Sequence, residues 1–265
     1  MPPAKKIEII HQDENIVVVN KPSGISVTKD RSGNPDLIPV LAKQLPDVAK
    51  LLLVHRLDKD TSGVMILAKN TETQSLYSSG FEKRLFKKTY LALVNGAMIH
   101  NSGCIKTPIS RSRKNPKVMV ADPKHGKPAI TDWKLLADFG MIALLAVSPV
   151  TGRTHQIRIH MSNVHMPLAI DPLYSSTRPI LLSDFKAKYK VRRGREEKPL
   201  IERLTLHAYQ IEVPDEGGLQ AGRYIAPLDK KFAATIKMLT KHNAEGEEAF
   251  LDPAFFDAII KSKPI

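Results

Sequence analysis

Short apolar runs separated by polar turns are the dominant pattern of this chain. NIVVVN (15–20), LLLV (51–54) and VMILA (64–68) have the length and the β-branched content of strands. NKPSG (20–24) places proline and glycine directly after the first of these runs, which is turn chemistry. The other strand candidates are IEIIHQ (7–12), TYLALVN (89–95) and IALLAVSP (142–149).

Helical periodicity is less frequent. TETQ (71–74) has the form of a capping box. A second helix is expected after Gly152, with apolar positions at helical spacing up to Val164, although THQIRIH (154–160) also alternates as a strand would. A third is expected over residues 229–241. Strands mixed with a few helices, without regular βαβ alternation, predict an α+β fold with a largely antiparallel sheet.

The composition indicates a polyanionic partner. The chain has 265 residues, enough for one large domain or two small ones, and 42% of them are apolar. Lysine and arginine number 40 against 27 acidic residues, a net charge of +13. A basic surface attracts phosphate and releases counterions when it binds, which favours a nucleic acid, although many soluble proteins are also basic.

The basic residues gather in two stretches, residues 106–127 and residues 186–198. The first contains Lys106, Arg111, Arg113, Lys114, Lys117, Lys124 and Lys127 with Asp122 as its one acid. The second, KAKYKVRRGREEK, has Tyr189 among its bases. Each stretch could be a solvated charge run. Two of them in a basic chain, one interleaved with an aromatic ring, favour contact with RNA or DNA.

Several classes of protein are excluded by what the sequence lacks. A single cysteine, Cys104, cannot form an internal disulfide or a multi-cysteine zinc site. The start of the chain has no secretory pattern, and the longest apolar run, MIALLAV (141–147), is too short to cross a bilayer. We therefore expect a cytoplasmic protein without a membrane segment.

The densest polar stretch, HRLDKDTSG (55–63), lies between two strand candidates. DKDTSG matches the opening of a calcium loop, but Lys69 stands where that loop needs a glutamate. No zinc, P-loop, dinucleotide or serine-hydrolase motif is present. Arg56 and Asp58 project to the same side of an extended segment. They form either a salt-bridged hairpin tip or a site in which an ionised aspartate acts as nucleophile or base.

HRLDKDTSG resembles the signature loop of the RluA-type pseudouridine synthases, which isomerise uridine to pseudouridine in RNA. Further stretches resemble the other motifs of that family in the expected order over roughly residues 7–240. They are VVVNKPSGISV (17–27), KKTYLALVNG (87–96), SPVTGRTHQIRIHM (148–161), HMPLAIDPLY (165–174), LTLHAYQIE (204–212) and YIAPLDKKF (224–232).

The resemblance implies a role for each matching residue. Asp58 is implied to be the nucleophile, Tyr90 the base that removes the C5 proton, and Arg158 the partner that holds Asp58 ionised. Arg56 is implied to fill the stack that a flipped-out uridine leaves, and His55 to support the loop or to touch phosphate. The remaining RNA-binding candidates are Arg153, His155, Lys188, Lys190, Arg192 and Arg193. Neither a metal nor an organic cofactor is implied.

The implied architecture is a catalytic domain over residues 7–241, with a mixed sheet in two halves, flanking helices and a central cleft. We expect basic insertions at 106–127 and 175–200, and a C-terminal tail, 242–265, packed on the same domain. The first motif begins near residue 15, so no N-terminal S4-type domain is expected. The expected partner is structured RNA, ribosomal or transfer, bound by a monomer.

The principal alternative is a basic RNA-binding protein of the same fold without catalysis, but such a protein would not need Asp58, Tyr90 and Arg158 together. A hydrolase that uses Asp58 on another glycosidic bond would need a second carboxylate, and no recognisable motif supplies one. The sequence therefore predicts an RNA pseudouridine synthase.

Overall fold

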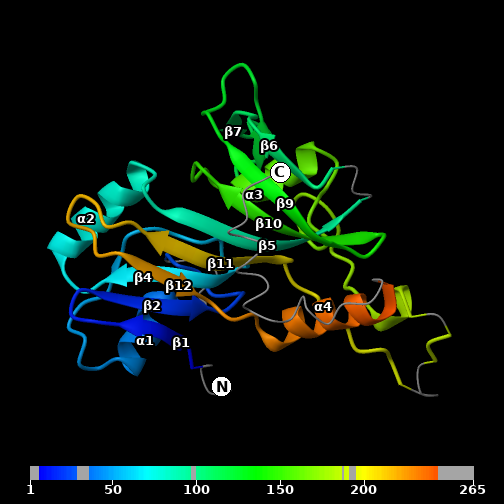
Figure 1. The fold of residues 1–265 in the computed structure, drawn as a ribbon, viewed down its shortest axis with the longest axis horizontal. Coiled ribbons are helices and arrows are strands. Elements are labelled where there is room, and N and C mark those ends of the chain that lie inside the picture. The colour runs from blue at the N-terminus through cyan, green and yellow to red at the C-terminus, as the bar shows by residue number, and fades with distance from the viewer. Residues whose placement is uncertain (1–5, 29–35, 97–99, 187, 191–194, 244–265) are drawn as a thin grey trace. The chain divides into compact units, whose positions relative to one another are not determined.

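The structure is a computed structural model, and it describes two compact units. The described residues are 6–28, 36–96, 100–186, 188–190 and 195–243. One unit is formed by Met1–Tyr90 with His207–Pro227, and the other by Leu91–Leu206 with Leu228–Ile265. Figure 1 shows the ribbon, coloured along the chain. Among the described residues, no helix has the length and apolar character that a bilayer span requires.

The first unit is built on a sheet in which strands β1, β2, β4 and β11 are neighbours in that order, with β12 paired to β11 and β3 to β4. All of these pairs are antiparallel except β4 with β11, which is parallel. The elements are β1 (Glu8–Gln12), β2 (Ile16–Lys21), α1 (Leu37–Gln44), β3 (Leu52–Leu53), β4 (Ser62–Ala68), α2 (Thr71–Glu82), β11 (Leu206–Val213) and β12 (Gly222–Ile225). Strand β5 (Lys87–Asn95) begins in this unit and continues into the second.

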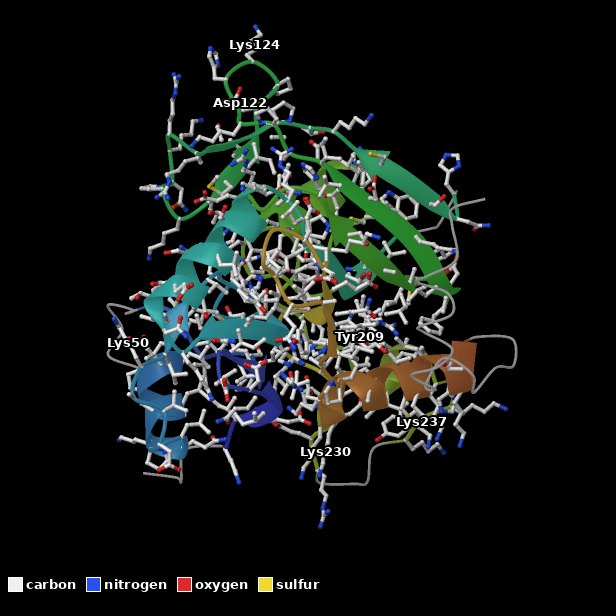
Figure 2. All side chains as sticks on the ribbon, turned by 60° about the vertical axis from the view of Figure 1, so that its left-hand side comes forward. Lys50, Asp122, Lys124, Tyr209, Lys230 and Lys237 are labelled. Carbon is white, nitrogen blue, oxygen red and sulfur yellow. The ribbon has the colours of Figure 1, made fainter. Side chains whose placement is uncertain are left out.

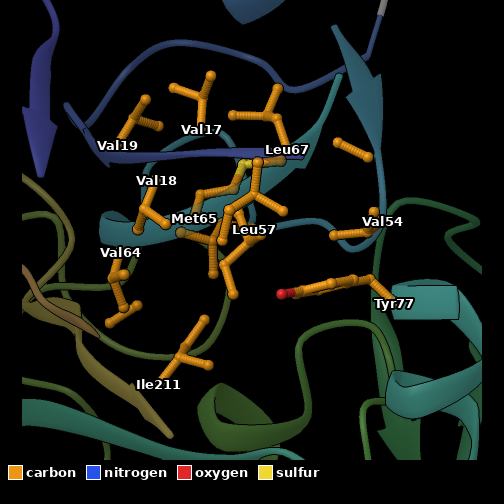
Figure 3. Close-up of a cluster of buried hydrophobic side chains, with 14 of the residues drawn as sticks. Val17, Val18, Val19, Val54, Leu57, Val64, Met65, Leu67, Tyr77 and Ile211 are labelled. Atoms are coloured by element: carbon orange, nitrogen blue, oxygen red, sulfur yellow. The ribbon is translucent and has the colours of Figure 1, made fainter. Parts of the chain in front are cut away.

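The core of the first unit lies around β2 and β4. Every residue of β4 is buried, because strands pair with it on both edges and its apolar run is continuous rather than alternating. Figure 3 shows side chains of β2 and β4 packed with Leu57, Tyr77 and Ile211. This core fixes the start of β4, directly after the segment that carries Asp58.

The second unit contains an antiparallel sheet in which β9 pairs with β10 and with β6, and a separate hairpin of β7 and β8. Its helix α3 follows β10 after a short polar connection. The elements are β6 (Ser102–Ile105), β7 (Ile109–Arg111), β8 (Met119–Ala121), β9 (Thr131–Asp138), β10 (Ile142–Pro149), α3 (Gln156–Asn163), a 3-10 turn (Leu182–Asp184) and α4 (Lys230–Asn243).

The predicted α+β class and the mostly antiparallel pairing are confirmed. The capping box at 71–74 is wrong: Asn70 caps α2, and its side chain accepts the N–H of Thr73 at 2.8 Å. Helix α1 was not expected, since Pro39 interrupts its short pattern. Strands β7 and β8 were hidden within the basic stretch 106–127.

The single catalytic domain over 7–241 and its central cleft stay predictions. Arg192 and Arg193 lie outside the described residues, as does the tail from residue 244 onwards.

Candidate active site

Asp58 lies in a turn that joins β3 to β4, here called the Asp58 turn (residues 55–61). The side chain of Leu57 is 5% exposed and belongs to the core, whereas Arg56 is exposed and Asp58 is partly buried. This alternation agrees with the expectation that Arg56 and Asp58 project to the same side. The N–H of Thr61 donates to the carbonyl of Asp58 at 3.2 Å, which closes the turn.

Residues 21–25, here called the β2 clasp, hold the Asp58 turn by its main chain. Lys21 is fully buried, and its Nζ donates to the carbonyls of Lys59 (2.9 Å), Ile25 (2.9 Å) and Pro22 (3.1 Å). The Gly24 N–H also donates to the Lys59 carbonyl at 2.9 Å.

The hydroxyl of Ser23 completes this contact by donating to the carbonyl of Asp60 at 2.7 Å. A buried ammonium is tolerated only when its donors are satisfied, so Lys21 and the turn specify each other. The sequence indicated a turn at NKPSG and a resemblance to a family motif over 17–27, and the clasp was missed because its acceptors are main-chain carbonyls.

The exit of the Asp58 turn is fixed by a close approach of β4 to β11. Gly63 has φ of +118°, and a Cβ atom there would lie 2.1 Å from the carbonyl oxygen of Ala208, so only glycine fits. Next to it, the Ser62 hydroxyl bonds Nδ1 of His207 at 2.9 Å, and Nε2 of His207 bonds the Ala226 carbonyl at 3.1 Å. Asp58 therefore projects from a segment held on both sides.

Tyr90 lies on β5, partly buried against the core of the first unit. Burial raises the pKa of Tyr90, and the negative charge of Asp58 raises it further, so the phenol carries its proton at neutral pH. The two side chains thus act on each other electrostatically. Lys88, two residues earlier on the same strand, has a lowered pKa because it is buried and because Arg84 is nearby.

His55, the first residue of the Asp58 turn, holds the turn against β4 and α2. Its Nε2 accepts the N–H of Ile66 at 3.0 Å, and its ring stacks on Phe81 with centroids 4.4 Å apart. Burial, and then the charge of Lys88, lower the pKa of His55 to about 3. A neutral, stacked ring favours loop support over phosphate contact among the two expected roles. Contact of His55 with RNA stays a prediction.

Arg158 lies on α3 in the second unit, and it is 5% exposed. Its Nε donates to Oδ2 of Asp171 at 2.8 Å and its Nη2 to Oδ1 at 2.7 Å, a bidentate pair. Asp171 is itself fully buried and accepts the N–H of Leu173 at 2.9 Å. The sequence did not single out Asp171. The pairing of Arg158 with Asp58 stays a prediction.

The start of α3 is held by side chains of its own connection. His155 is the residue before the helix and has φ of +54°, which is strained for a residue with a side chain. Gln156 accepts from the Thr151 hydroxyl (2.6 Å) and from the Arg153 N–H (3.0 Å). The Arg153 guanidinium donates to the Pro128 carbonyl at 3.2 Å. RNA contact by Arg153 and His155 stays a prediction.

The basic candidates are on the surface. Lys188 and Lys190 are exposed, and Lys186 lies over the ring of Tyr189, 5.6 Å from its centroid. In the first basic stretch the exposed bases are Lys106, Arg111, Arg113, Lys114, Lys117, Lys124, His125 and Lys127. Lys124, Lys50, Lys230 and Lys237 are labelled in Figure 2 and are all exposed. Within the described part of the chain, no group of three or more histidine, cysteine or acidic side chains could hold a metal ion.

The structure has an aspartate in a turn fixed from the core, a tyrosine whose pKa is raised partly by the charge of that aspartate, and exposed bases. This arrangement is consistent with the RNA-modifying enzyme that the motifs predict. The sequence model of the family described as RNA pseudouridylate synthase matches residues 15–163. The chain belongs to this family, whose members are isomerases that act on RNA.

Individual relatives agree with this assignment. Ribosomal large subunit pseudouridine synthase D of Borreliella burgdorferi is 34% identical over 245 residues, which cover 89% of this chain and 69% of the relative. Synthase C of Buchnera aphidicola subsp. Baizongia pistaciae is 36% identical over 234 residues, covering 87% and 70%. The solved structure of Human RNA Pseudouridylate Synthase Domain Containing 4 matches with a TM-score of 0.66 and 27% identity, covering 88% of this chain and 92% of that one.

Proposed function

We propose that this protein isomerises specific uridines of large-subunit ribosomal RNA to pseudouridine, with Asp58 as the nucleophile. The observation that carries the proposal is the Asp58 turn, whose main chain is bound by the buried ammonium of Lys21 while the Asp58 side chain influences Tyr90. Both ribosomal and transfer RNA were expected from the sequence. The names of the relatives favour ribosomal RNA.

The chemistry gives Asp58 and Tyr90 successive tasks. Asp58 either bonds to the ribose C1′ or takes the C2′ proton, and in both cases it loses its negative charge while the glycosidic bond breaks. That charge is one cause of the raised pKa of Tyr90. When the uracil rejoins the ribose through C5, Asp58 leaves C1′ or returns the proton to C2′, and it is ionised again. The C5 proton then needs an acceptor. Tyr90 takes it and passes its own phenol proton to water, so the proton count balances.

The target uridine must leave its stack to reach Asp58, and we assign to Arg56 the role of filling the emptied position. Arg56 is exposed and lies two residues before Asp58 on the same segment. A planar guanidinium stacks on bases, so it suits an emptied position in structured RNA. We further propose that the protein acts as a monomer in the cytoplasm, where ribosomal RNA is available.

The test is tritium release from RNA labelled at C5 of uridine, with large-subunit ribosomal RNA and transfer RNA as separate substrates. Asp58→Asn keeps the shape of the side chain but removes the nucleophile, and we expect product formation to fall at least about 10⁴-fold. RNA affinity should stay within about twofold, since no binding group is lost.

Asp60→Asn is the matched control, because the contact of residue 60 with Ser23 uses its main-chain carbonyl and survives the change. Its activity should equal that of the wild type. A wild-type protein that binds RNA but forms no pseudouridine would support the non-catalytic alternative. An Asp58→Asn variant with normal turnover would remove Asp58 from the role of nucleophile.

A further inference from the structure

Tyr174 connects the exposed basic hairpin of the second unit to Arg158. The basic hairpin is defined here as residues 109–121, which are β7, β8 and the turn between them. The phenol oxygen of Tyr174 accepts the main-chain N–H of Met119 on β8 at 2.9 Å. The Arg158 guanidinium lies over the ring of the same tyrosine, 5.1 Å from its centroid.

The inner face of the basic hairpin rests on a small apolar cluster that includes Tyr174. Ile109 of β7 packs with Ala129 and with Ile159 of α3, and Met119, Ala121 and Tyr174 lie against them. Ile159 is the residue after Arg158 on α3. The hairpin therefore rests on the helix that carries Arg158, and the ring of Tyr174 belongs to both contacts.

The hydroxyl of Tyr174 also reaches the strained start of α3. Nδ1 of His155 lies 2.8 Å from this oxygen, so the hydroxyl can donate to His155 while it accepts from Met119. The main-chain N–H of Tyr174 lies 3.3 Å from Oδ1 of Asp171, the carboxylate that binds Arg158. A positive φ in a residue with a side chain persists only where its surroundings impose it, and the bond from Tyr174 is one such constraint.

The outer part of the basic hairpin carries a charge that suits RNA. Arg111, Arg113, Lys114 and Lys117 are exposed and lie within a span of seven residues. Bases so placed track a phosphate backbone. A hairpin with RNA on its outer part and Tyr174 on its inner face connects substrate binding to the position of Arg158.

We propose that Tyr174 is a positioning residue through which RNA bound to the basic hairpin orients Arg158 for the reaction. The proposal rests on the proposed function, because it needs RNA as the substrate and Arg158 as a member of the site. It adds a coupling between substrate binding and chemistry. Tyr174 itself touches Arg158 and the hairpin, and it is assigned no contact with the reacting uridine.

The test is a double-mutant cycle on the saturating rate of pseudouridine formation, measured with enzyme in excess over a large-subunit ribosomal RNA fragment. Tyr174→Phe keeps the ring beneath Arg158 and removes both hydroxyl contacts. The hairpin variant changes Arg111, Arg113, Lys114 and Lys117 to serine. We expect each variant to lower the saturating rate about tenfold, and the hairpin variant also to weaken RNA binding about tenfold.

The combined variant should be no slower than either parent, because each change interrupts the same connection. Rates that multiply to about a hundredfold loss would overturn the proposal. So would an unchanged rate for Tyr174→Phe, or unchanged RNA binding for the hairpin variant. Tyr77→Phe, in which a buried tyrosine in the core of the first unit loses its hydroxyl, is the matched control and should keep the wild-type rate.

Two further readouts separate positioning from a general loss of structure. A folding defect lowers the fraction of active enzyme and therefore the reaction amplitude, whereas a positioning defect lowers the rate constant at full amplitude. RNA affinity should be unchanged in Tyr174→Phe, since its hairpin keeps every charge. If the wild-type protein forms no pseudouridine, the proposed function fails, whereas additive losses in an active enzyme overturn only the role of Tyr174.

Discussion

The Asp58 turn and the basic hairpin are anchored in opposite ways. The Asp58 turn is bound from the core by main-chain hydrogen bonds and by a fully buried ammonium, that of Lys21. The basic hairpin has a three-pair ladder, a small apolar cluster and the hydroxyl of Tyr174 beneath it, with its charges in solvent. A nucleophile must keep its position to within a fraction of an ångström, whereas a phosphate-binding surface benefits from exposed, adaptable side chains.

This contrast predicts that changes near the Asp58 turn alter rate or stability, and that changes to exposed bases alter RNA binding, with an effect on the rate only where the bases belong to the basic hairpin. After Asp58→Asn, the largest effect is expected for Tyr90→Phe, which removes the proposed proton acceptor and keeps the ring. Product formation should fall about 10³-fold, while RNA affinity stays within about twofold. Tritium release and a denaturing gel that detects a stalled enzyme–RNA adduct measure the two stages. A fully active Tyr90→Phe would exclude the base role.

Lys21→Met should have the next largest effect. Methionine fills the space of the buried stem but leaves the carbonyls of Pro22, Ile25 and Lys59 without the ammonium donor. We expect the free energy of unfolding in urea to fall by about 3 kcal/mol. The saturating rate should also fall about tenfold, because the turn is no longer held.

Ser23→Ala is the control for Lys21→Met, since it removes one bond of the same clasp, to the Asp60 carbonyl. Its expected cost is about 1 kcal/mol. Equal stability of the wild type and Lys21→Met would show that the β2 clasp does not support the turn.

His55 should make stability depend on pH. Its pKa is lowered to about 3 in the folded protein, from 6.5 in an unfolded chain, so the neutral ring contributes stability above pH 6.5 that is lost as the pH falls toward 3. Between pH 7.5 and pH 5 this loss amounts to up to about 2 kcal/mol. His55→Gln keeps an acceptor for the Ile66 N–H without titrating, so urea unfolding should vary less with pH. The same pH dependence in His55→Gln and in the wild type would contradict the assignment of this titration to His55.

The smallest effect is expected for the second basic stretch. Changing Lys188, Lys190, Arg192 and Arg193 to serine should weaken RNA binding about tenfold and flatten its dependence on salt. The saturating rate should be unchanged. The control changes four other exposed lysines, Lys43, Lys50, Lys230 and Lys237. An equal loss of RNA affinity in both variants would indicate a general effect of net charge. An unchanged salt dependence would indicate that this stretch is a solvated surface without RNA contact.

Most of the sheet could be predicted from the sequence because its strands are short, apolar and bounded by turn residues. The strand predicted over LLLV (51–54) was less accurate, since only Leu52–Leu53 pairs with β4. The small strands β7 and β8 could not be predicted. Their sequence is dominated by exposed bases, and the apolar contacts of Ile109 and Met119 are made with residues far along the chain.

The residues of the candidate site likewise divide into those that a local motif predicts and those that only contacts between distant segments reveal. HRLDKDTSG left Arg56 and Asp58 open between a salt-bridged hairpin tip and a site, and the resemblance of this stretch and of the further motifs to the family then predicted Asp58 as the nucleophile. The residues that hold the site were missed. Lys21 meets Lys59 across 38 positions, and its acceptors are main-chain carbonyls that carry no signature in the sequence. Tyr174 meets Met119 across 55 positions, again through a main-chain group.

The sequence by itself determined the class of fold and the family, and it predicted the reacting side chains, because these depend on local patterns of polarity and on contiguous motifs. Only the tertiary structure decided what supports those side chains. It showed that His55 binds the main chain of Ile66, that Lys21 binds the main chain of the Asp58 turn, and that Tyr174 lies at the junction of hairpin and helix. Such contacts join distant segments through main-chain atoms, which every residue has and no residue type identifies.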